Sequence, residues 1–284
     1  MKRLLRWIGI AFASLVALAI VACGVVYVLS ENALHRTYPR PPVALTAPTD
    51  PAAIQEGKRL ATMRGCFAGC HGKEAEGAVM FDKPEIARIV APNLTAAAKK
   101  YSDAELAVIV RNGVKPDGQS MLVMPSQTFA GLTDADVGKI IAFLKALREV
   151  PGPGPRIEAG PIGRLGLALG KFKMAAEHVA LDVPPPEAAN EDGKQGRYLA
   201  RTICSECHGS NLQGDSNPSF TSPGMRVMAA YSPEAFRELM RTGTAVGGRT
   251  LGVMTTQSRN NLSHLTDAEI AALYAFLRPL AQAN

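Results

Sequence analysis

The hydrophobic positions of this chain follow two patterns, and both are helical. Residues 7–29 form 23 consecutive positions without a charge, which as a helix is long enough to cross a hydrocarbon core of about 30 Å. Two later regions show apolar residues at i, i+3, i+4 and i+7, which predicts a single buried stripe on each helix. The stripe positions are Val137, Ile140, Ile141 and Leu144 in one region and Ile270, Leu273, Tyr274 and Leu277 in the other. No alternating strand pattern of useful length occurs, so we expect an all-α protein.

The two striped helices belong to two copies of one sequence plan, predicted as domains at residues 51–150 and 187–284. Each copy has a normal size for a domain. The matching segments are Gly57-Lys-Arg-Leu-Ala61 with Gly196-Arg-Tyr-Leu-Ala200, Arg111-Asn-Gly113 with Arg241-Thr-Gly243, Leu132-Thr-Asp-Ala-Asp136 with Leu265-Thr-Asp-Ala-Glu269, and Ala142-Phe-Leu144 with Ala275-Phe-Leu277. A feature found in both copies is therefore better supported than a feature found in one.

Capping residues predict where the helices begin and end. A capping box predicts a start at Ser102, and a glycine predicts a stop at Gly113. The counterpart helix is expected to begin at Ser232, before a proline, and to end near Gly243. The last helix of each copy has its own capping pair, Thr133 with Asp136 and Thr266 with Glu269.

Proline-rich segments precede and separate the copies. Residues 31–50 contain Tyr38-Pro-Arg-Pro-Pro-Val43 and are predicted to form a stiff, extended spacer. Residues 151–186 are predicted as a linker, with prolines clustered at both ends. Its segments 162–170 and 172–181 are apolar enough to pack against something. A face of a domain is the first interpretation, and the membrane surface is the second.

The first thirty residues are predicted to anchor the chain in a membrane. Lys2, Arg3 and Arg6 precede the apolar run, and Trp7 and Tyr27 lie near its two ends. Aromatic rings favour the headgroup region at such positions. The positive-inside bias places the three basic residues in the cytoplasm and everything after the apolar run outside it.

Two alternatives to this anchor are kept open. A cleaved signal peptide is the first, although its apolar region spans only about 7–15 residues. Lipidation is the second, because Cys23 ends a stretch that resembles a lipoprotein cleavage box. The apolar run continues beyond this cysteine, so we expect a plain buried thiol instead.

The formal net charge of +6 does not indicate nucleic-acid binding. The three basic residues before the apolar run account for half of it and leave +3 on the exported part. Elsewhere Lys and Arg are scattered among Asp and Glu rather than clustered in a basic run. We therefore expect no nucleic-acid partner.

The segment Cys204-Ser-Glu-Cys207-His208 has the most specific chemistry in the chain. A C-x-x-C-H run is the sequence mark of covalent c-type haem attachment. Its two thiols form thioethers with the haem vinyl groups, and His208 binds the iron. Because three protein groups must meet one rigid cofactor, chance matches are uncommon. A zinc site or a thioredoxin-like pair is the alternative, but zinc usually takes four ligands in two spaced pairs.

A second, imperfect motif lies at Cys66, Cys70 and His71, with one extra residue between the thiols. That residue must bulge out if both sulfurs are to reach the vinyl groups, and Gly69 can take the dihedral angles that a bulge needs. A short-loop disulfide is the alternative for this pair. Because the motif lies in the repeat, we predict a second covalent haem with His71 on its iron. Whether Cys66 forms a thioether stays open.

Each copy also offers a methionine as sixth iron ligand. Met124 lies thirteen residues after Arg111, and Met254 lies thirteen residues after Arg241. A thioether ligand stabilises the reduced iron and raises its potential. We predict Met124 and Met254 as axial ligands opposite the motif histidines; another Met or a His is the alternative. The other histidines, interpreted as surface or helix-cap residues, are His35, His178 and His264.

With these motifs, residues 50–150 and 187–284 resemble the class I c-type cytochromes. In particular they resemble membrane-anchored dihaem cytochromes c that accept electrons from dehydrogenases in bacterial respiratory chains. The resemblance implies a few helices around each haem, with the downstream Met as sixth ligand. It carries over residue by residue to the second motif and Met254, although Thr255 rather than a proline follows this Met. At Cys66 the extra residue departs from the family pattern.

Two haems with His and Met ligands leave no open site for a substrate. We therefore expect an electron carrier rather than an enzyme, with the cytochrome subunit of a dehydrogenase as one form of it. The donor is expected to be a dehydrogenase or quinol-oxidising partner, and the acceptor a terminal oxidase or a soluble cytochrome. The expected location is the bacterial inner membrane, with one span and with the haem domains in the periplasm. The alternative is a haem enzyme, a peroxidase or small sulfur-compound oxidoreductase, with one open or displaceable ligand.

Overall fold

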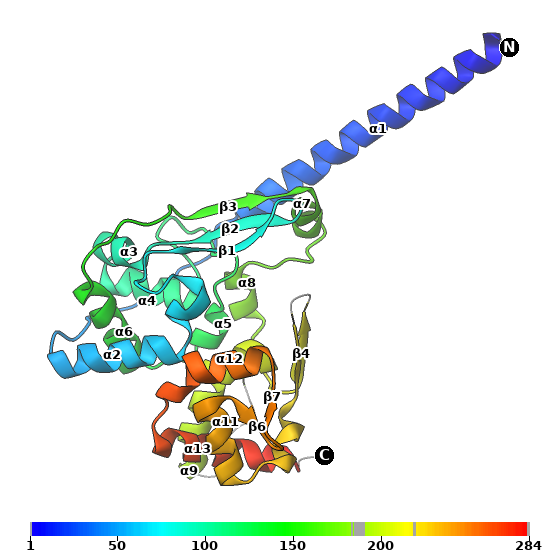
Figure 1. The fold of residues 1–284 in the computed structure, drawn as a ribbon. Coiled ribbons are helices and arrows are strands. Elements are labelled where there is room, and N and C mark those ends of the chain that lie inside the picture. Colours follow the sequence, from blue (N-terminus) through cyan, green and yellow to red (C-terminus); the bar gives the residue numbers. More distant parts are fainter. Residues whose placement is uncertain (1, 183, 185–190, 218–219, 283–284) are drawn as a thin grey trace.

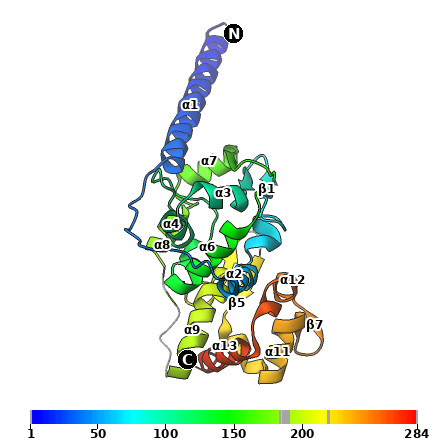
Figure 2. The same cartoon turned by 90° about the vertical axis from the view of Figure 1, so that its left-hand side faces the viewer.

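The structure is a computed structural model of the 284-residue chain and describes residues 2–182, 184, 191–217 and 220–282. The all-α class is confirmed: two helical domains follow a long N-terminal helix, α1 (Lys2–Leu34), which projects from the globular part (Figure 1). In both views the second domain lies at the end of the molecule farthest from α1 (Figures 1 and 2). The predicted boundary between linker and second domain, at residues 186 and 187, lies outside the described residues.

The long helix α1 has the properties of a membrane span. It has 33 residues, its most apolar window has a mean hydropathy of 2.6, and none of that window is buried against the rest of the protein. By length and composition, α1 can therefore cross a membrane.

The first domain is built from five helices, of which the first and last pack against each other. They are α2 (Pro51–Met63), α3 (Leu94–Lys100), α4 (Asp103–Asn112), α5 (Ser126–Phe129) and α6 (Asp134–Ala146). The second domain repeats this plan, again with its first and last helices in contact. Its helices are α9 (Glu191–Leu199), α10 (Ser205–His208), α11 (Pro233–Thr242), α12 (Val253–Asn260) and α13 (Asp267–Leu280), with 3₁₀ turns at Met225–Ala230 and Leu262–His264.

Two matching glycines set the distance between the crossing helices. A Cβ atom on Gly57 would lie 1.9 Å from the carbonyl oxygen of Lys139, and a Cβ atom on Gly196 would lie 2.1 Å from that of Ala272. Any side chain at either position would therefore collide with backbone of α6 or α13. The glycine at the start of each repeat is thus required for close helix packing.

The predicted capping and stripe residues fall where the sequence places them. Ser102 and Thr266 form complete capping boxes, and Thr133 accepts from the amide of Asp136. Gly113 and Gly243 end α4 and α11 with left-handed φ values of 65° and 75°. The predicted stripe residues are buried, except Tyr274, which is half-buried. Most buried apolar residues of the two domains form one cluster that includes members of both.

Short strands, absent from the sequence-based expectation, accompany the helices. The strands β1 (Ala78–Lys83), β2 (Ala87–Ala91) and β3 (Arg156–Ala159) form one antiparallel sheet. Two hairpins lie in the second domain: β4 (Gly214–Asn217) with β5 (Phe220–Pro223), and β6 (Thr244–Ala245) with β7 (Arg249–Thr250). These strands have two to six residues, and β1 has a register shift between Val79 and Phe81. Such short or irregular strands show no clear alternation.

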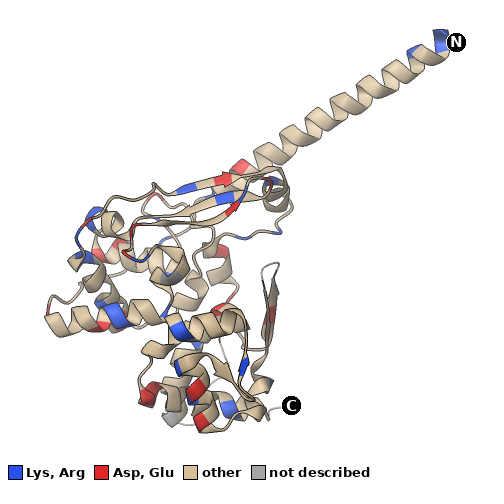
Figure 3. Cartoon of the chain, viewed as in Figure 1, with Lys and Arg blue, Asp and Glu red and all other residues tan. Residues whose placement is uncertain are grey.

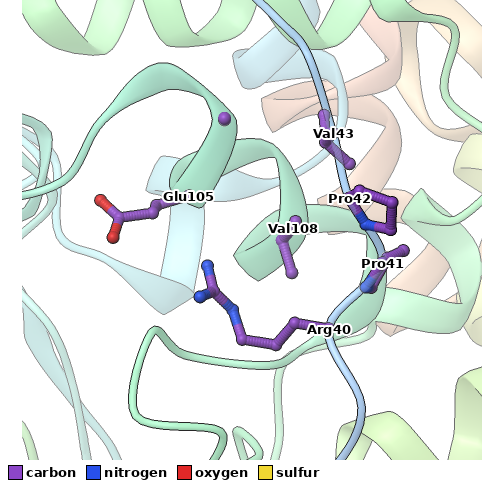
Figure 4. A pocket seen from close by; sticks show the side chains of 7 residues that line it. Arg40, Pro41, Pro42, Val43, Glu105 and Val108 are labelled. Carbon is purple, nitrogen blue, oxygen red and sulfur yellow. The ribbon is translucent and has the colours of Figure 1, made fainter.

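The segments predicted as spacer and linker both pack on the first domain. In the spacer, Thr37 forms a bridge with Gln119, and the amide of Ala47 donates to Asp103 at 2.8 Å. In the linker, β3 completes the sheet, and α8 (Ala175–Ala180) packs on α5. Between the spacer and α4 lies a groove of about 300 Å³ lined by Arg40, Pro41, Pro42, Val43, Ala104, Glu105 and Val108 (Figure 4). Its lining includes none of the predicted haem residues.

Two of the polar contacts between the domains are related to each other by the repeat. Arg59, two residues after Gly57, donates to both carboxylate oxygens of Glu269 at 2.8 and 2.9 Å. Tyr198, two residues after Gly196, donates to Asp136 at 2.5 Å. Because the two acceptors hold matching places in the Leu-Thr-Asp-Ala segments, exchanging the domains exchanges the contacts. The interface therefore has approximate two-fold symmetry.

Candidate haem sites

The second motif lies on two successive turns of different pitch. A π-helical turn, Ala200–Cys204, ends at the first cysteine, and α10 then carries the second cysteine and the histidine. The ring Nδ1 of His208 lies 2.8 Å from the carbonyl oxygen of Pro223. The structure thus places Cys204, Cys207 and His208 together within nine residues of the end of α9.

The first motif accommodates its extra residue in a π-helical turn, Cys66–Cys70. The amide of His71 donates to the carbonyl oxygen of Cys66 at 3.0 Å, which is the i to i+5 bond of such a turn. Gly69 has a φ of 109°, a value that favours glycine. The ring Nδ1 of His71 lies 2.9 Å from the carbonyl oxygen of Pro92. Despite the insertion, the histidine therefore meets the same kind of partner as its counterpart.

The proline carbonyls determine which nitrogen of each histidine is available. A carbonyl oxygen only accepts, so each Nδ1 carries the proton and donates it. This leaves Nε2 of His71 and His208 as the nitrogen that can ligate a metal, with the ring orientation fixed by the bond at Nδ1. Burial lowers the pKa of both imidazoles, which favours the neutral form that binds iron. The donor set therefore fits a haem iron in both domains.

Burial raises the pKa of all four motif cysteines, which favours the protonated thiol. All five cysteines lie in the described part of the chain, and all five are free. Burial raises the pKa of Cys66 and Cys204 to about 12, and that of Cys207 to about 11. A thioredoxin-like pair needs a lowered thiol pKa instead. Within the described residues no three His, Cys, Asp or Glu side chains gather in a metal-binding group, so zinc would lack further ligands.

A buried arginine lies beside the first motif. The side chain of Arg64 is only 1% exposed and donates to the carbonyl of Leu60 and to Thr202 of the other domain. The carboxylate of Asp136 lies 3.7 Å away. Its Nε has no partner among the described residues. A buried donor in this position suits a haem propionate, which adds to the fit of the first site.

The structure also shows a repeated loop that the sequence comparison of the two copies missed. Four residues after each histidine, Ala75 and Leu212 adopt left-handed φ values of 63° and 64°. Their carbonyls accept from the amides of Leu94 and Met225 at 2.8 and 3.0 Å. Met225 thus matches a leucine, consistent with a packing role.

The proline partners of the histidines were also missed. Pro92 lies 21 residues after its histidine, whereas Pro223 lies 15 residues after its own. This unequal spacing hides the correspondence between the two prolines. Each histidine is followed directly by a glycine and has another glycine six residues later, and these shared positions could have revealed that the two loops correspond.

The two methionines predicted as axial ligands are half-buried and pack against the core. Met124 lies in the loop before α5, whereas Met254 lies in the first turn of α12. Met124 lies eight residues before Leu132, whereas Met254 lies eleven residues before Leu265. The second copy therefore has three additional residues between its methionine and its last helix. Their role as ligands stays a prediction. The remaining histidines, His35, His178 and His264, are exposed.

The fold, the paired end helices and the repeated cysteine and histidine geometry define a class of haem protein. The family model of cytochrome c matches residues 54–148 and 193–281, and the chain belongs to this family. Membership implies covalently attached haem c, which fits the donor sets described above.

The curated relatives of this chain are subunits of larger dehydrogenases. It is 24% identical over 265 residues to the fructose dehydrogenase cytochrome subunit of Gluconobacter japonicus, covering 82% of this chain and 54% of the relative. It is 26% identical over 274 residues to the gluconate 2-dehydrogenase cytochrome c subunit of Pantoea cypripedii, covering 81% and 60%. The cytochrome c subunit of the quinone alcohol dehydrogenase of Komagataeibacter europaeus is 22% identical over 272 residues, covering 84% and 58%. The chain therefore spans between half and two thirds of the length of these relatives.

Proposed function

We propose that this chain carries single electrons as the cytochrome subunit of a membrane-bound dehydrogenase. The observation that carries the proposal is the doubled site: each domain presents two cysteines and a histidine whose Nδ1 is bound to a proline carbonyl. The relatives, each named as the cytochrome subunit of a dehydrogenase, support this over the haem-enzyme alternative.

The proposal includes two covalent haems c. Cys66, Cys70 and His71 hold the first, with Met124 as sixth ligand. The second is held by Cys204, Cys207 and His208, with Met254 as sixth ligand. The haem supplies an iron that gains and loses one electron at a time.

The protein groups around each site have separate tasks. The proline carbonyls fix the ring orientation and tautomer of the histidines. As ligands, the methionine thioethers would stabilise the reduced iron and would leave no free ligand position for a substrate. Because the two domains share one buried apolar cluster, their sites are held in a fixed relation to each other.

The proposed location follows from α1, with a single span in the inner membrane and the haem domains in the periplasm. The domains 51–150 and 187–284 are the proposed haem-binding units. The electron donor is then a periplasm-facing dehydrogenase, and the acceptor a membrane oxidase, a quinone-linked complex or a soluble cytochrome. A reporter fused after residue 284 should be active only outside the cytoplasm. Cytoplasmic reporter activity would contradict the topology.

The haem number is tested by intact mass and by haem staining after denaturing electrophoresis. The wild-type chain should carry two haem additions. A Cys66→Ala variant should keep its first haem attached through Cys70 alone. The matched variant in the regular motif is Cys204→Ala. A single haem addition in the wild-type chain would contradict the reading of the first motif.

Electron transfer itself is tested in native membranes that contain the full chain. Addition of fructose, gluconate or ethanol, the substrates that the relatives' names suggest, should reduce the haem iron within one dehydrogenase turnover. The change in the haem absorption spectrum measures this reduction. The purified chain alone should not turn over hydrogen peroxide or a small sulfur compound. Rapid turnover of either by the purified chain would support the enzyme alternative instead.

A further inference from the structure

The linker helix α7 (Pro161–Ala168) presents an apolar stripe to the outside of the protein. Ile162, Leu165 and Leu169 follow each other at helical spacing and are 56%, 45% and 63% exposed. The opposite face is buried: Gly163 lies against the backbone of Ile86, and Leu167 is 6% exposed. The helix is therefore packed on one side and apolar on the other, where nothing in the described part of the chain covers it.

The position of α7 along α1 is fixed by one arginine. Arg164 donates to the hydroxyl of Ser30 at 2.9 Å and to the carboxylate of Glu31 at 2.7 Å. Its guanidinium also lies over the ring of Tyr27, 4.3 Å from the centroid. These three partners lie where the uncharged run of α1 ends. If α1 spans a bilayer, α7 therefore lies at the level of the membrane surface.

The figures agree with this placement. In both orientations α7 lies on the end of the globular part from which α1 leaves (Figures 1 and 2). Figure 3 shows α1 without charged residues between its basic N-terminal end and the turns beside α7. The apolar stripe thus belongs to a helix that lies where the predicted span leaves the globular part.

The charges around the stripe suit the headgroup region. Residues 160–173 contain Arg164, Lys171 and Lys173 and no acidic residue. The two lysines are exposed and flank Phe172, which is itself 44% exposed. A surface helix with an apolar face and basic neighbours is the pattern that binds a bilayer interface, particularly one with anionic lipids.

We propose that α7 and the following turn, residues 161–173, form a second membrane contact that inserts its apolar stripe into the bilayer interface. The contact rests on the proposed span of α1. With two contacts instead of one, the first haem domain would be held at a fixed orientation on the membrane. The occupant of the stripe is lipid, and a protein partner is the alternative that the test must separate.

The test uses the haem-loaded full chain in vesicles of phosphatidylethanolamine and phosphatidylglycerol, without other proteins. Single cysteines replace Leu165 or Leu169 in a Cys23→Ala background and carry a nitroxide spin label. Leu18→Cys reports on α1, and Val246→Cys, an exposed apolar position in the second domain, is the matched control. Power saturation of the reduced protein measures the access of oxygen and of a water-soluble nickel chelate to each label.

We expect labels at positions 165 and 169 to be reached better by oxygen than by the nickel chelate, as at position 18, with the reverse at position 246. Exchange of phosphatidylglycerol for a neutral lipid should raise nickel access at 165 and 169 only. Water-like access at 165 and 169 with a membrane-buried label at 18 would overturn the α7 contact while leaving the anchor intact. Water-like access at 18 would overturn the anchor, and the α7 contact with it.

Discussion

The two cytochrome c domains share one plan but differ in what surrounds them. The first is wrapped by other parts of the chain: the spacer pairs with it through Thr37, β3 joins its sheet, and α8 packs on α5. The second has its own two hairpins and packs on the first across an approximately symmetric interface. The comparison separates the features of the cysteine and histidine motifs, which occur in both domains, from the packing of spacer and linker, which occurs only in the first.

The largest effect is expected from removal of the histidines. His71→Ala should abolish the low-spin signal of one iron and leave the other, and His208→Ala should do the converse. Each change removes the histidine whose Nε2 is oriented by a proline carbonyl in its domain. Electron paramagnetic resonance of the two variants measures this. Loss of both signals in either variant would show that the two sites are not independent.

Adding a side chain at the glycines where the end helices cross is expected to have the next largest effect. Gly57→Ala and Gly196→Ala each place a Cβ about 2 Å from a backbone oxygen, at 1.9 and 2.1 Å. Overpacking of this kind costs about 1–3 kcal/mol or more. Chemical denaturation followed at the haem absorbance should show this loss for both variants. Gly138→Ala is the control, because its Cβ would meet only Pro48 at 3.4 Å. Equal destabilisation by all three changes would contradict the close-crossing account.

The interface contacts sharpen the comparison at a smaller scale. Arg59→Met leaves the half-buried carboxylate of Glu269 without its bidentate partner, and we expect a loss of about 2 kcal/mol. Tyr198→Phe removes one hydrogen bond to Asp136 and should cost about 1 kcal/mol. A double-mutant cycle with Glu269→Gln isolates the first contact. A coupling energy near zero would show that the arginine contributes by packing alone.

The smallest effect is expected in the dependence of stability on acidic pH. Burial acts to raise the pKa of Glu269, but hydrogen bonds from Arg59 and Thr266 outweigh it and hold the pKa below its ordinary value of 4.5. Such a carboxylate stabilises the folded state above its unfolded-state pKa, and this contribution is lost as pH falls through the folded-state pKa. Glu269→Gln should therefore flatten the fall in stability below about pH 4.5. An unchanged acid profile would contradict the assignment.

Local sequence signals predicted the helices well. The caps at Ser102 and Thr266, the glycine stops and the buried stripes depend on residues within one or two turns of each other. The cysteine motifs and the need for an unusual dihedral at Gly69 are equally local. For this reason they could be read directly from the chain.

The features that were missed depend on distant or irregular partners. β3 pairs with β2, whose partner residues lie about seventy positions earlier in the chain, and neither strand is long enough to alternate. The carbonyls that orient the histidines come from prolines at unequal distances. The packing of spacer and linker on the first domain follows from tertiary contacts that composition alone does not encode.

The central proposal is that each iron has one His and one Met ligand and transfers electrons. Its most direct test is an optical and magnetic spectrum of the oxidised full chain. We expect two low-spin haems, each with a Met-to-iron charge-transfer band, and the loss of one band in Met124→Ala and of the other in Met254→Ala. A high-spin haem in the resting protein, with either methionine variant spectrally silent, would contradict the proposal and favour a catalytic haem.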